Sequence, residues 1–249
     1  LYMINNKNCV VVSTFLDDNP ISIKRRENMI KNCKQYNLPL FGIKGIRYKE
    51  WHENNPIAVL SSFETTLRML YAYKKLNIEY GIICQDDFFP KDNFLEELNI
   101  TVERLPKDWE ILHLCPGQYW GRLEYRDKKK IDDLIVGKFV PEKKILYKMP
   151  CSKDNRYFYD LYKHRKELIN EGITWLGGPV AFLVRRSNID IFLHKYRMHN
   201  IIAPDDKKLF LIMDKYSYVC KEPQLGYENE CGGGTCTEIL KKENNIIVK

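Results

Sequence analysis

Two adjacent carboxylates, Asp86 and Asp87, are the side chains of this 249-residue chain whose chemistry can be read first. They follow the apolar run Tyr80–Cys84 and precede Phe88–Pro90. Two unit negative charges about 4 Å apart repel by about 4 kcal/mol at an effective dielectric constant near 20, so such a pair needs a positive group beside it. A divalent cation such as Mg²⁺ or Mn²⁺ supplies that charge and commonly binds substrate phosphates as well. The pair therefore indicates a cation and diphosphate site, unless one Asp caps the next helix and the other is solvated.

The segments around this pair alternate between strand and helix patterns. Apolar runs of strand length cover residues 9–15, 40–43, 80–84 and 109–114. One-sided helical patterns lie between them, over residues 20–36, 56–70 and 94–105. This alternation predicts an α/β fold with a mainly parallel central sheet, and such sheets bind ligands at the carboxyl ends of their strands. Asp86 and Asp87 stand at that end of the third strand.

The regular pattern stops after Pro116. Residues 120–170 contain 14 Lys and Arg against 8 Asp and Glu, which accounts for +6 of the net charge of +7. We interpret residues 116–174 as a basic insertion of long loops, which would attract anions. Order returns at Gly177 and Gly178, which lead into an apolar run, and Asp205-Asp206 opens a further helical pattern.

Composition excludes several classes of protein. Hydrophobic residues make up 44% and charged residues 29%, as in an ordinary globular domain. No run approaches the roughly 20 apolar residues that span a bilayer, so no membrane span is expected. The basic segment carries no RNA-recognition, zinc-finger or zipper motif, so we do not expect nucleic acid as a partner. Residues 1–7 have no apolar core of a signal peptide, and several cysteines lie in apolar runs, so the default expectation is a cytoplasmic location.

Four segments carry a resemblance through their order and spacing. They are IKRRENM at 23–29, AVLSSF at 58–63, IICQDDF at 82–88 followed by WEILHL at 109–114, and GGPVAFLV at 177–184 followed by PDD at 204–206. Together they resemble glycosyltransferase family 25, the lipopolysaccharide and procollagen galactosyltransferase relatives with a GT-A type fold. Two positions depart from the family pattern, because Gln85 stands where Glu is usual and Ser62 where His is usual.

The resemblance implies a single GT-A-like, Rossmann-like domain over residues 1–240. Residues 1–115 would form its nucleotide-sugar-binding half, 116–174 the basic insertion and 175–240 the acceptor-side half, with residues 241–249 as a tail.

The resemblance also implies a reaction. A sugar would pass from a nucleotide-diphosphate donor, a UDP-hexose such as UDP-galactose or UDP-glucose, to an acceptor hydroxyl on a glycan or protein, with inversion and with Mn²⁺ or Mg²⁺. Asp87 would bind the metal, although Gln85 removes one acidic ligand and makes the ion less firmly held or dispensable. Asp205 or Asp206 would take the acceptor proton, if they are not simply a helix cap. The residues that would contact the donor are Arg25, Ser61, Asp86, Gly177 and Gly178.

Two other functions remain open from the sequence. A sugar-phosphate nucleotidyltransferase also combines an α/β sheet with metal-binding Asp, but it usually has a Gly-rich basic loop after its first strand. Here that loop contains the acidic Asp17-Asp18-Asn19-Pro20 instead. A non-catalytic glycan- or nucleic-acid-binding module would use the basic and aromatic middle segment, and would bind its ligand without consuming a nucleotide sugar.

Overall fold

The computed structural model of the chain describes residues 3–16, 20–46, 56–90, 92–114, 158–160, 181–198, 217–220 and 226–228. Its helices are α1 (Pro20–Gln35), α2 (Pro56–Leu76), α3 (Phe94–Arg104) and α6 (Ile189–Met198), the last preceded by a 3₁₀ turn, η3 (Arg186–Asn188). Its strands are β1 (Cys9–Phe15), β2 (Leu40–Lys44), β3 (Tyr80–Cys84), β4 (Phe88–Pro90), β5 (Ile111–His113), β6 (Phe158–Asp160), β7 (Ala181–Arg185), β8 (Ser217–Cys220) and β9 (Gly226–Glu228).

A central sheet of seven strands has the order β2-β1-β3-β7-β5-β8-β6. β1 pairs in parallel with β2 and with β3, and β5 pairs in parallel with β8. β7 is antiparallel to both of its neighbours, β3 and β5, and β6 is antiparallel to β8. Five of the seven strands (β1, β2, β3, β5 and β8) therefore point the same way, and the predicted α/β class with a mainly parallel sheet is confirmed.

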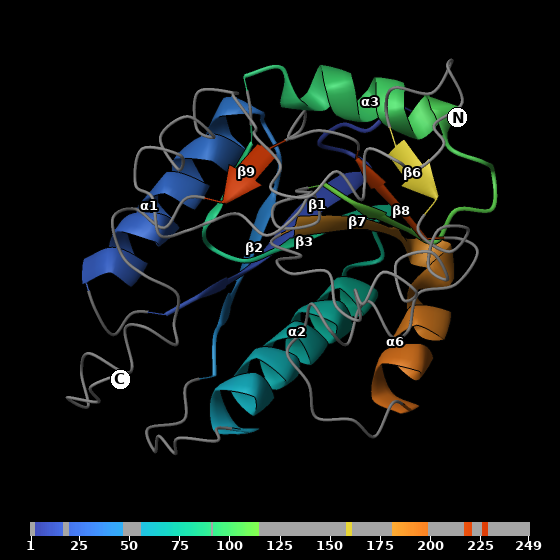
Figure 1. Cartoon of the computed structure of the whole chain (residues 1–249). Coiled ribbons are helices and arrows are strands. Elements are labelled where there is room, and N and C mark those ends of the chain that lie inside the picture. The colour runs from blue at the N-terminus through green and yellow to red at the C-terminus, as the bar shows by residue number, and fades with distance from the viewer. Residues whose placement is uncertain are drawn as a thin grey trace, which may run out of the picture.

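Helices cover both faces of this sheet (Figure 1). Alternate residues of β1 face opposite ways, as the pleat of a strand requires. Cys9 and Val11 join a core cluster with residues of α1 and α3, whereas Val10 and Val12 join a second cluster with residues of α2 and α6. The molecule is thus built as three layers, with α1 and α3 over one face and α2 and α6 over the other.

The inner face of α1 matters most for the site. Its buried residues are Ser22, Arg25, Met29 and Cys33. Their spacings of three, four and four place them on one side of a helix. Pro20 occupies the first helical position, where its missing N–H costs nothing. Three of these side chains are small or apolar, so Arg25 is a charged residue on an otherwise core-forming face.

Short pairings connect distant parts of the chain. β4 pairs antiparallel with β9 in a separate two-stranded sheet, which the sequence did not predict. β6 lies within residues 116–174, so the segment interpreted as a basic insertion contributes one strand to the central sheet. The division of residues 1–240 into three parts stays a prediction. None of the helices in the described ranges has the length and apolar composition that a bilayer crossing requires.

Candidate functional site

Asp86 and Asp87 form the turn that joins β3 to β4. The backbone N–H of Phe88 donates to the carbonyl oxygen of Gln85 at 3.3 Å, which makes the two Asp the central residues of the turn. Asp is favoured in turns because its short carboxylate can accept hydrogen bonds from nearby backbone. β3 ends at Cys84, which is aligned with Ser13 of the parallel strand β1. The pair therefore lies at the carboxyl edge of the parallel strands, as predicted.

Arg25 reaches this turn from the inner face of α1. Its Nη1 lies 3.7 Å from Asp86 Oδ1 and 3.8 Å from Asp87 Oδ2. The three side chains are only 5%, 10% and 8% exposed, respectively. The structure thus brings together three of the residues that the sequence singled out, and it shows which group supplies the positive charge in this arrangement.

Burial makes this ion-pair cluster energetically significant. At about 4 Å and an effective dielectric constant near 20, each attraction is of the order of 4 kcal/mol, which offsets the repulsion between the carboxylates. Removing one partner of a buried ion pair typically costs about 3 to 5 kcal/mol, because it leaves a buried charge uncompensated. Burial raises the pKa of the Asp87 carboxyl above its ordinary value, and the Arg25 guanidinium opposes that shift. Asp87 Oδ1 is buried and accepts no hydrogen bond from the described part of the chain.

The donor set can be compared with what a divalent cation requires. Mg²⁺ and Mn²⁺ prefer several oxygen ligands in a near-octahedral arrangement. Asp87 Oδ1 is suitable, but the facing oxygens of both carboxylates already lie within 4 Å of the guanidinium. Among the described residues, no group of three or more His, Cys, Asp or Glu is placed to hold a metal ion. The arrangement of Asp86 and Asp87 therefore fits the Arg25 guanidinium better than a divalent metal ion.

Of the other residues predicted to bind the donor or to act in catalysis, the structure describes only Ser61. Ser61 is half-buried in the second turn of α2, the helix layered on the face of the sheet opposite to α1. Its role in donor binding stays a prediction. Gly177, Gly178, Asp205 and Asp206 lie outside the described residues.

Two features beside the Asp pair were missed by reasoning from the sequence. Ser13 is fully buried at the carboxyl end of β1, opposite Cys84. The sequence signal for Ser13 is a small polar residue near the end of a strand that neighbours the strand before the Asp pair. The second feature is β9, whose Glu228 is aligned with Phe88, the residue that follows Asp87. Nothing in the sequence pairs segments that lie so far apart.

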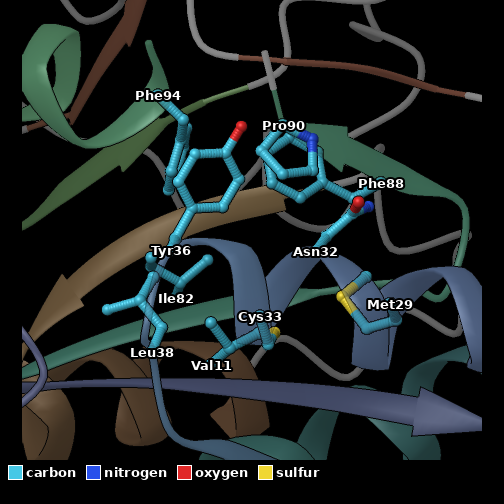
Figure 2. A pocket seen from close by; sticks show the side chains of 10 residues that line it. All are labelled: Val11, Met29, Asn32, Cys33, Tyr36, Leu38, Ile82, Phe88, Pro90 and Phe94. Atoms are coloured by element: carbon cyan, nitrogen blue, oxygen red, sulfur yellow. The ribbon is translucent and has the colours of Figure 1, made fainter. Parts of the chain in front are cut away.

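A small cavity lies between α1 and the strands β1, β3 and β4 (Figure 2). Its lining residues are Val11, Met29, Asn32, Cys33, Tyr36, Leu38, Ile82, Phe88, Pro90 and Phe94. Its volume is about 20 Å³, enough for about one water molecule. A sugar or a nucleobase does not fit into this space.

Other chemically reactive side chains belong to the core. His113 is 1% exposed, and burial lowers its pKa to about 3, so the imidazole is neutral at physiological pH. Cys9 and Cys33 are buried free thiols whose pKa is raised by burial to about 12. Thiols with such a pKa are poor nucleophiles.

Comparison with known proteins finds similarity among solved structures. No family model matches the sequence, and no curated protein matches it. Among solved structures, the chain is similar to a glycosyltransferase involved in the glycosylation of the major capsid of PBCV-1. The identity is 10%, the TM-score is 0.49, and the match covers 96% of this chain and 99% of that chain. Membership of family 25 stays a prediction, and the function proposed below rests on the site rather than on this likeness.

Proposed function

We propose that the chain is a glycosyltransferase that uses a nucleotide-diphosphate sugar as its donor. The observation that carries the proposal is the buried cluster of Arg25, Asp86 and Asp87 at the carboxyl edge of β3. Burying three charged side chains is costly and does not favour a role in stability alone. A buried carboxylate whose pKa is raised by burial, at the carboxyl edge of an α/β sheet, is instead typical of functional sites. The sequence resemblance to family 25 implies that Arg25 and Asp86 contact the donor and that Asp87 binds a metal ion.

The proposed reaction replaces one bond at the anomeric carbon with another. The acceptor oxygen attacks that carbon, the bond from the carbon to the diphosphate oxygen breaks, and the nucleoside diphosphate leaves with the electron pair. A carboxylate takes the proton of the acceptor hydroxyl. We assign this proton transfer to Asp205 or Asp206, and we assign close backbone approach to the sugar to Gly177 and Gly178.

The Asp pair would act on the donor. Carboxylate oxygens accept hydrogen bonds from ribose or sugar hydroxyls, and we assign this role to Asp86. Asp87 Oδ1 is the acceptor in this turn that the described residues leave unused. A hydrogen bond to a charged group contributes about 1.5 to 3 kcal/mol, equivalent to a factor of about 10 to 100 in binding. We propose a UDP-hexose, such as UDP-galactose or UDP-glucose, as the donor, and a glycan or protein hydroxyl as the acceptor.

The experiment is donor hydrolysis without acceptor. The purified chain is incubated with UDP-, GDP- and dTDP-sugars, and the released nucleoside diphosphate is quantified with Mn²⁺ and with chelator. We expect release from one donor, reduced at least about tenfold in Asp86→Asn and in Asp87→Asn. Asp92→Asn is the matched control, because Asp92 is an exposed carboxylate a few residues away. No release and no binding of any of these nucleotides would refute the proposed function.

A further inference from the structure

The position of one nitrogen atom in the Asp cluster carries a further inference. Arg25 Nη1 lies at nearly equal distances from one oxygen of each carboxylate, 3.7 Å from Asp86 and 3.8 Å from Asp87. A cation shared by two adjacent carboxylates neutralises both of them at once. A divalent metal ion would perform the same electrostatic task, from a similar place between the two groups.

The location of Arg25 supports this comparison. The side chain comes from the buried face of α1, between Ser22 and Met29, and the residue is only 4% exposed. A guanidinium in that position cannot extend into solvent to meet a ligand without leaving the carboxylates. It therefore acts on the Asp pair itself, and it does so before any ligand arrives.

A divalent ion bound to the same oxygens would lie close to this fixed positive charge. Like charges at a few ångströms repel strongly, and burial weakens the screening by water. Arg25 and a divalent ion are therefore competitors for the same pair of carboxylates.

We propose that Arg25 takes the charge-balancing place of a divalent cation between Asp86 and Asp87, so that no metal ion is needed to hold the pair. Arg25 is then a positioning residue, which fixes the two carboxylates for the ligand. The inference rests on the proposed function, because the ligand for which Arg25 fixes the carboxylates is the proposed nucleotide-sugar donor. Its test uses metal binding alone, so failure of this inference and failure of the proposed function are separate results.

The test is a titration of the full chain with Mn²⁺ after chelator treatment, with free Mn²⁺ followed by electron paramagnetic resonance. The variants are Arg25→Gln, which removes the charge, and Arg25→Lys, which keeps it. We expect Arg25→Gln to bind Mn²⁺ at least about tenfold more tightly than the wild type, which corresponds to about 1.4 kcal/mol. Arg25→Lys should show no gain, and adding Asp87→Asn to Arg25→Gln should abolish it. Equal or weaker Mn²⁺ binding by Arg25→Gln would overturn the proposal.

A second measurement covers the case in which Arg25→Gln does not fold. The thermal unfolding of the wild type is compared with and without Mn²⁺. We expect the midpoint to change by no more than about 1 °C. A ligand at about 100 times its Kd would raise the midpoint of a domain of this size by roughly 5 °C or more. A shift of that size that disappears in Asp87→Asn would show that the wild-type pair binds metal, and would overturn the proposal.

Discussion

Arg25 Nη1 lies 3.8 Å from Asp87 Oδ2, and both side chains are more than nine-tenths buried. The arginine comes from the inner face of α1, and the aspartate from the turn after β3. This contact joins a helix of the outer layer to the carboxyl edge of the parallel strands. The chemistry of the site and the stability of the fold are therefore coupled through one ion pair.

Loss of the Arg25 charge should destabilise the protein. Arg25→Ala leaves two buried carboxylates without this partner, so we expect the free energy of unfolding to fall by about 3 to 5 kcal/mol. Urea unfolding at pH 7 measures the change. Arg26→Ala is the matched control, since Arg26 is the exposed neighbour on the same helix, and it should cost about 1 kcal/mol or less. Equal effects of the two substitutions would show that the buried cluster contributes nothing.

Asp87 should give the stability an unusual dependence on pH. Burial raises the pKa of Asp87 in the folded chain above its unfolded value, so the folded chain binds a proton more readily. The contribution of this group to stability therefore increases as the pH falls through the folded pKa, toward the unfolded pKa of about 3.9. Asp87→Asn removes this contribution.

Urea unfolding at a series of pH values between neutral and acidic tests this prediction. The free energy of unfolding of Asp87→Asn, minus that of the wild type, should be largest at the highest pH. This difference should decrease as the pH falls. A difference that changes in the opposite direction would mean that Asp87 has a lowered pKa in the folded chain.

His113 should destabilise the fold in acid. Its pKa is lowered to about 3 by burial, whereas an unfolded chain binds this proton below about pH 6.5. Stability should therefore fall by about 1.4 kcal/mol for each pH unit below that value, through this one group. His113→Gln cannot be protonated in this range, so its unfolding free energy should decline less steeply between pH 6 and pH 4. Parallel slopes for the variant and the wild type would refute this account.

Gly81 should resist substitution because β3 packs closely on α2. A Cβ at this position would lie 2.6 Å from the Cδ2 of Tyr73. Tyr73 is fully buried, and its hydroxyl donates to the carbonyl oxygen of Glu79 at 2.8 Å and lies 3.3 Å from that of Val184, so the ring is held in place. We expect Gly81→Ala to cost about 1 to 3 kcal/mol, measured by urea unfolding.

A double-mutant cycle identifies the cause of that cost. In a Tyr73→Leu background, which removes the ring, Gly81→Ala should cost much less. An unchanged cost in that background would assign the effect to the backbone of β3 rather than to contact with Tyr73.

The sequence singled out Arg25, Asp86 and Asp87 but did not predict their contact. Met29 and Cys33 follow Arg25 at intervals of four, so the helical period already assigns Arg25, and not Arg26, to the inner face. The contact of Arg25 Nη1 with both carboxylates depends on the position of α1 along β3. Tertiary packing determines that position. Hydrophobic periodicity reports which face is buried, and it does not report the neighbour across it.

Strand directions were only partly predictable. β1, β2 and β3 are joined by helices, and a helical crossover makes neighbouring strands parallel. The antiparallel direction of β7 was not predictable, because residues 116–174 of the sequence carry no regular hydrophobic period. The three-residue strands β4 and β9 form by tertiary pairing, since runs this short have no strand signal of their own.

The most direct test of the central claim is binding of UDP to the chelator-treated wild-type chain by isothermal titration calorimetry. A site formed by Arg25, Asp86 and Asp87 predicts measurable binding without metal, weakened at least about tenfold by Asp86→Asn and unchanged by Asp92→Asn. Absence of binding by UDP, GDP and dTDP, with or without Mn²⁺, or equal affinity in Asp86→Asn, would contradict the account.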